Sequence, residues 1–109
     1  MSQWIPAAGG PIIDTALGQG ITEAGTYYLN RAKMDLHRPF AFGASVRTAG
    51  HTATVQLFAE VTGVQTNLDA ALVPTYGTPA AASNEYSLTG DRGIVVSGVT
   101  GTVYPEAVQ

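Results

Sequence analysis

The stretch FAFGASVRTAGHTATVQLFAE, residues 40–60, shows the clearest pattern in this chain of 109 residues. Apolar side chains occupy alternate positions on both sides of the short segment Ala49-Gly50-His51. A period of two predicts β-strands with one apolar face, and two such strands around a Gly-containing turn predict a β-hairpin. The expected inward residues are Phe40, Phe42, Ala44 and Val46 before the turn, and Ala53, Val55, Leu57 and Ala59 after it.

Shorter runs of β-forming residues, separated by glycine or proline, lie outside this hairpin at residues 26–29, 85–88, 94–96 and 102–104. Gly98 and Gly101 bracket a tight connection, so the last two strands are expected to pair and close a sheet. Ile94 and Val96 would then face the core. About six or seven short strands predict an all-β fold, a single β-sandwich or jelly-roll domain over residues 20–109.

Residues 1–19 are expected to form an extended N-terminal arm. Glycines and prolines punctuate this segment, so it holds no self-sufficient helix or strand. It nevertheless carries more apolar anchors than a disordered tail, and such a segment gains order on another surface. That surface is either its own domain or a neighbouring subunit. We expect the arm to cross to the neighbouring subunit and to bind it through Trp4, Ile5, Ile12 and Ile13.

The composition favours a subunit of an assembly. Charged residues make up 12% of the chain, against a usual share of about 25%, and a poorly charged surface is often covered by a partner. The absence of cysteine excludes disulfides and thiolate metal sites. No run is long enough to span a membrane, and the N-terminal residues do not resemble a signal peptide, which predicts synthesis in a cytoplasm.

The positive charges are gathered in one stretch, although the net charge is -3 and therefore unlike that of a nucleic-acid binder. The stretch contains Arg31, Lys33 and Arg38, with Arg47 further along. One interpretation is a solvated connection between strands. The other is a basic patch that binds an acidic partner surface.

No motif for catalysis or metal binding is present. His37 and His51 both lie in expected connections, without a second histidine at metal-binding spacing. A Ser-His-acid site depends on geometry and stays open, but the sequence lacks a nucleophile-elbow motif. We therefore expect no enzyme, and no catalytic, cofactor-binding or metal site.

Three segments in this order, "GQGITEAGTYYL", "ATVQLFAEV" and "YSLTGDRGIVVSGVTGTV", resemble small β-sandwich structural proteins of tailed bacteriophages. The resemblance covers residues 20–103, and its most characteristic part is the closing element from Gly93 to Thr102. Arg92 departs from the pattern, because it precedes the expected strand at residues 94–96 instead of lying within it. The resemblance implies a virion component, such as a capsid decoration (cement) protein, and it implies no catalysis.

On this basis we expect a capsid decoration protein of the virion, made in the host cytoplasm. Its partners would be the major capsid protein or other virion subunits, with no nucleic acid, no membrane and no cofactor. We also expect a homo-oligomer, for which a trimer is one option. The alternatives are a tail, fibre or head-tail connector module, and a carbohydrate-binding β-sandwich. The last would need exposed aromatic side chains on one face, for which Tyr27, Tyr28, Tyr76 and Tyr86 are the candidates.

Overall fold

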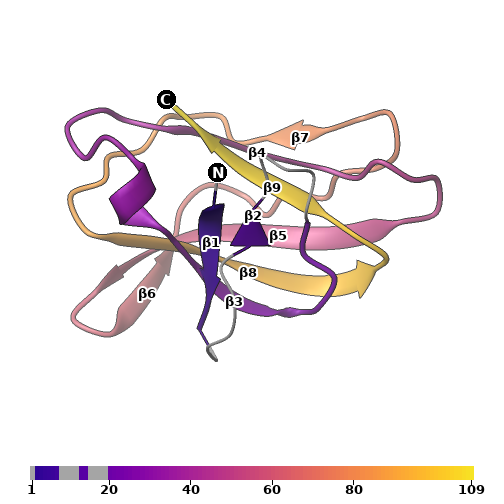
Figure 1. Ribbon diagram of the computed structural model, residues 1–109, viewed down its shortest axis with the longest axis horizontal. Helices are drawn as coiled ribbons and strands as arrows, with labels where there is room; N and C mark the ends of the chain where they lie inside the picture. The colour runs from indigo at the N-terminus through magenta and orange to yellow at the C-terminus, as the bar shows by residue number, and fades with distance from the viewer. Residues whose placement is uncertain (1, 8–12, 15–19) are drawn as a thin grey trace.

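The computed structural model describes residues 2–7, 13–14 and 20–109, and these form a β-sandwich of two antiparallel sheets (Figure 1). The described part contains one short 3₁₀ turn, η2 (Arg31–Lys33), and no helix that is long and apolar enough to cross a membrane. The larger sheet has the order β2 (Ile13–Asp14), β1 (Ser2–Pro6), β3 (Gly25–Leu29), β8 (Asp91–Thr100), β5 (Thr52–Val61) and β6 (Val64–Asn67). The smaller sheet has the order β7 (Ala80–Ala81), β4 (Ala41–Ser45) and β9 (Tyr104–Val108). The all-β sandwich is therefore confirmed.

The core lies between the two sheets, and the alternating patterns identify about half of the residues that fill it. Phe40, Phe42, Ala44 and Val46 are buried, as are Ala53, Val55 and Leu57, while Ala59 is half-buried. Ile94 and Val96 are also buried, as expected from the sequence. Removal of this apolar surface from water stabilises the sandwich by about 25 cal/mol per Å².

The expected hairpin over residues 40–60 is wrong, because its two strands belong to different sheets. β4 pairs with β7 and β9, whereas β5 pairs with β6 and β8. Residues 46–51 cross from one sheet to the other. Two strands that each have one apolar face can pair side by side in one sheet, or they can face each other from the two sheets of a sandwich. Alternation alone does not distinguish these arrangements.

The expected pairing of the last two strands is wrong for the same reason. β8 continues through Gly98 to Thr100, with an irregular register against β5 where Thr52 pairs with Thr100 and Thr54 with Ser97. Residues 101–103 then cross to the smaller sheet, where β9 pairs with β4. Gly98 therefore lies within a strand near a bulge, a position where glycine is common.

The beginning of the expected arm is a strand of the sandwich itself. β1 pairs with β3, so that Trp4 lies opposite Leu29 and Pro6 opposite Tyr27. Trp4 is 0% exposed and packs edge-on against Phe42, with ring centroids 5.8 Å apart. Trp4 is thus an anchor within its own domain, which corrects its expected role in partner binding.

The other three arm residues have different outcomes. Ile5 is half-buried within β1, opposite Tyr28 of β3. Ile13 belongs to β2, which pairs with β1. Ile12 lies outside the described residues. The strand pairing of β1 was missed because its partner, β3, follows about 20 residues later, after a stretch rich in glycine.

Candidate partner-binding surface

The outer face of the smaller sheet carries a groove of about 460 Å³. Its floor is formed by the outward residues of the central strand β4, which are Ala41, Gly43 and Ser45. These side chains are small, so the backbone of β4 lies close to the surface. A Cβ atom on Gly43 would lie 3.2 Å from the carbonyl oxygen of Ala80, so glycine also allows β7 to approach closely.

Larger side chains from β9 form one wall of the groove. Tyr104, Glu106 and Val108 point outward along this strand. The strand register places Tyr104 opposite Ser45 and Glu106 opposite Gly43. Pro79 and the two residues of β7 form the other wall. The groove therefore follows β4 between two rows of neighbouring strand residues, a width that suits one extended chain.

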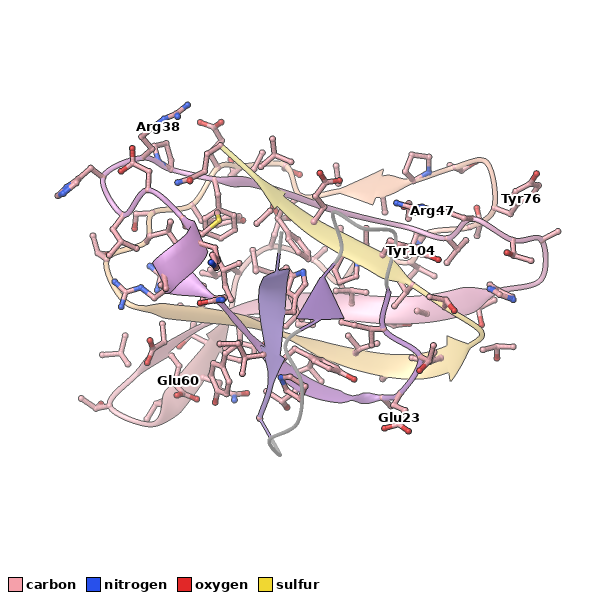
Figure 2. The ribbon with its side chains drawn as sticks, viewed as in Figure 1. Glu23, Arg38, Arg47, Glu60, Tyr76 and Tyr104 are labelled. Carbon is pink, nitrogen blue, oxygen red and sulfur yellow. The ribbon has the colours of Figure 1, made fainter. Side chains whose placement is uncertain are left out.

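Two opposite charges lie beside this apolar floor. The guanidinium carbon of Arg47 lies 3.8 Å from the ring centroid of Tyr104, in a cation–π contact (Figure 2). The Glu106 side chain is exposed, and its carboxylate forms no hydrogen bond or ion pair with any described residue. Side chains two residues apart on a strand are about 6.8 Å apart. A strand laid in the groove could therefore present one charge to each.

The expected basic patch does not form, because its residues point to separate partners. Arg31 donates from Nη2 to the carbonyl oxygen of Leu88 at 2.9 Å, and its Nη1 lies 4.0 Å from Asp91 Oδ1. Arg38 donates to the backbone oxygen of Gln109 at 3.0 Å. Lys33 is exposed. Figure 2 shows Arg38 and Arg47 far apart, in opposite halves of the view.

Arg31 and Arg38 therefore hold a connection onto the sandwich, which agrees with the interpretation of a solvated connection. Gln109 completes this arrangement with its side-chain amide. Its Nε2 donates to the carbonyl oxygens of Asp35 and Arg38 at 2.6 and 3.0 Å, and its Oε1 accepts from the Asp35 N–H at 2.8 Å.

The four candidate tyrosines do not share a face. Tyr27 is buried, and burial raises its pKa, while its hydroxyl donates to the carbonyl oxygen of Glu23. Tyr28 donates to Glu60 Oε1 at 2.9 Å, and this hydrogen bond raises the Tyr28 pKa. Tyr86 donates to Asp69 Oδ2 at 2.9 Å. Only Tyr76, which is 62% exposed, projects freely. An aromatic platform for a sugar is therefore not built from these four residues.

Asp69 is the most strongly hydrogen-bonded carboxylate of the described residues. It accepts from the N–H groups of Ala70 and Ser83 at 2.9 and 2.8 Å, as well as from the Tyr86 hydroxyl. These bonds, led by the one from Ala70, hold the pKa of Asp69 below its ordinary value of 3.8. Asp69 has a φ of 66°, an uncommon conformation that aspartate tolerates better than most residues. Its role is to join two connections of the sandwich.

The histidines are separate from one another and from any acidic cluster. His51 Nδ1 accepts from the Thr102 N–H at 3.1 Å, which places the proton of a neutral ring on Nε2. The backbone N–H of His37 donates to Asp35 Oδ1 at 3.0 Å. Within residues 2–7, 13–14 and 20–109, no three His, Cys, Asp or Glu side chains are placed to hold a metal ion.

The groove was missed in the sequence because its two sides are far apart along the chain. Small outward residues in β4 and larger ones in β9 were both visible as alternating patterns. Their complementarity appears only when Gly43 pairs with Glu106.

No protein-family model matches this sequence, and no curated protein or solved structure matches it either. The chemistry of the groove is therefore the basis for a functional proposal.

Proposed function

We propose that this protein is a structural component of a tailed-phage virion, which decorates or cements the capsid by binding a head subunit in the groove of the smaller sheet. The observation that carries the proposal is the pair of charges, Arg47 and Glu106, beside a floor of Ala41, Gly43 and Ser45. The resemblance of residues 20–103 to phage structural proteins supports the virion as the setting.

The occupant that fits the groove is an extended segment of the head subunit. One of its side chains would be acidic and lie against Arg47, and a second, two residues away, would be basic and lie against Glu106. Such an arrangement selects the orientation of the segment, because reversal would bring like charges together. A small or flat apolar side chain of the segment would cover Gly43 and Ala81. Burial of this apolar surface would favour binding by about 25 cal/mol per Å², before the costs of association are subtracted.

An interface confined to this groove would be small, and interfaces below about 1,200 Å² are typical of weak complexes. Many copies on one particle compensate, because each bound copy raises the effective concentration at neighbouring sites if the copies are joined. A decoration protein meets this condition better than a soluble receptor does.

A tail, fibre or connector module would use the same groove on a different virion partner, and it remains the alternative. Any role in partner binding for Ile12 and the neighbouring arm residues stays a prediction. A carbohydrate-binding function has weaker support, because the tyrosine hydroxyls of Tyr27, Tyr28 and Tyr86 are engaged within the domain.

The test is co-sedimentation of the purified protein with heads of the encoding phage that lack it. Native protein should bind to the heads, and Glu106→Lys should bind at least about tenfold more weakly, because like charges then meet in the groove. Ala81→Trp should also reduce binding, since its indole would fill the groove. Glu85→Lys is the matched control, because Glu85 is exposed outside the groove.

Two results would contradict the proposal. One is the absence of binding by native protein to heads, with binding to tails instead favouring the alternative. The other is full binding by both Glu106→Lys and Ala81→Trp, which would move the interface to another surface.

A further inference from the structure

The edges of the two sheets differ in how well they are protected from pairing with another strand. β2 and β7 are two residues long. β9 contains Pro105, whose carbonyl oxygen accepts a hydrogen bond from the Trp4 indole. Short edges, proline and covered carbonyls are the means by which proteins avoid unwanted strand addition. Three of the four edges that the described residues form therefore carry a recognised protective feature.

The fourth edge, β6, carries none of these features. Its sequence, Val64-Gln65-Thr66-Asn67, has no charge and no proline, and all four residues are exposed. Figure 1 shows the β5–β6 hairpin projecting away from the smaller sheet. At its tip, Val61 and Val64 are 64% and 63% exposed although they form a cross-strand pair. This edge is both open and apolar enough to favour a partner.

The backbone of β6 is oriented for strand addition. The Leu68 N–H donates to the Leu57 carbonyl at 2.9 Å, which marks this pair as hydrogen-bonded. Hydrogen-bonded and non-hydrogen-bonded pairs alternate in an antiparallel ladder. Thr66 therefore directs its backbone groups toward β5, whereas Gln65 and Asn67 direct theirs toward the open side.

A second copy of β6 fits this edge in a self-complementary register. If Thr66 lies opposite Thr66 of the second copy, Gln65 lies opposite Asn67 on both sides of the two-fold axis. These two pairs are the ones whose backbone groups are free, and their side-chain amides can also bond to each other. The same register places the exposed Val64 opposite Leu68.

Electrostatics permit the two copies to approach. Like charges meet across an isologous contact when the edge is charged, but β6 is neutral. The nearest carboxylate on its neighbour is Glu60, which accepts from Gln65 Nε2 at 3.3 Å. The two Glu60 residues would be separated by three strand spacings, about 14 Å, beyond the screening length of about 8 Å.

We propose that two copies of this chain pair antiparallel through β6, so that their six-stranded sheets join into one continuous sheet. The contact goes beyond the proposed function, because it needs no virion partner and uses a different part of the surface from the groove. Its failure would leave the groove untouched, and failure of the groove would leave this contact untouched.

The first test is sedimentation equilibrium of the purified protein over a wide concentration range. The native mass should rise from 11.3 kDa toward twice that value. Thr66→Lys should weaken association at least about tenfold, because two lysines then meet on the axis. Gln65→Pro should act similarly, since it removes a donor from the open side and leaves the bonds to β5 intact. Ser97→Lys, in the exposed part of a central strand, should associate like native protein.

The second test uses the absence of cysteine from the chain. Thr66→Cys should form an intermolecular disulfide under mild oxidation, because facing residues of a non-hydrogen-bonded pair lie close together. Ser97→Cys should react much more slowly. A native protein that stays monomeric at all concentrations would overturn the proposal. A native dimer with no preference for Thr66→Cys over Ser97→Cys would also overturn it, since the contact would then lie elsewhere.

Discussion

Trp4 and Pro105 join the two sheets through one hydrogen bond. The Trp4 indole Nε1 donates to the Pro105 carbonyl oxygen at 3.0 Å, over a sequence separation of 101 residues. The same contact satisfies a buried donor and covers a carbonyl on the edge of β9. It fastens the first strand of the larger sheet to the last strand of the smaller one.

This contact predicts a large effect of Trp4 on stability. Trp4→Ala should lower the free energy of unfolding by about 3–5 kcal/mol, because it leaves a cavity and removes the hydrogen bond. Deletion of residues 2–7 should prevent stable folding, since it removes a strand of the larger sheet. Urea unfolding followed by circular dichroism measures both. Val73→Ala is the control, because Val73 is 61% exposed and should change stability by less than about 0.5 kcal/mol. A truncated chain that unfolds like native protein would show that β1 is dispensable.

Gly101 should be intolerant of a side chain for two separable reasons. Its φ is 78°, and an added Cβ would overlap the His51 ring. Gly50 shares the positive φ, at 85°, but has open space around it. Gly50→Ala should therefore cost about 1–2 kcal/mol from its backbone alone, and Gly101→Ala should cost more. The excess should disappear in a His51→Ala background, as a double-mutant cycle would measure. An undiminished excess would exclude the histidine as its cause.

Replacement of Thr62, at the tip of the β5–β6 hairpin, should stabilise the protein. Thr62 and Gly63 have φ angles of 50° and 78°, as in a two-residue turn with both central residues left-handed. A β-branched residue is strained there, whereas Asn-Gly is preferred. Thr62→Asn should raise the free energy of unfolding by about 1 kcal/mol. Thermal unfolding would measure the gain, and Thr89→Asn, in an exposed loop, is the control. Equal effects at both positions would argue against relief of strain.

The stabilising contribution of Asp69 should be lost in acid. Its pKa is lower in the folded chain than the ordinary value of 3.8, so the folded state binds fewer protons. The stabilisation is complete above the ordinary value and is lost as the pH falls through the lower, folded pKa. The stability advantage of native protein over Asp69→Asn should therefore be greatest near neutral pH and should shrink below about pH 4. Urea unfolding across this range is the measurement, with Glu85→Gln as the control. An advantage that stays constant in acid would contradict the assignment.

The sequence by itself determined which side chains of the alternating segments face the core. Alternation assigned Phe42, Leu57 and Ile94 to the interior because the β backbone turns successive side chains to opposite faces. This rule acts over neighbouring residues, so it needs no knowledge of the pairing partner. It also predicted the all-β class, and the absence of cysteine excluded disulfides.

Only the tertiary structure decided which strands pair. β4 and β5 lie next to each other in sequence but in opposite sheets, as do β8 and β9. The groove depends on this choice, because Glu106 reaches Gly43 only when β9 pairs with β4. The open edge of β6 depends on it as well, since an edge exists only once the order of the sheet is set. Backbone hydrogen bonds are chemically the same for every strand, so the partner is chosen by how all the apolar faces pack together, and that information is not local.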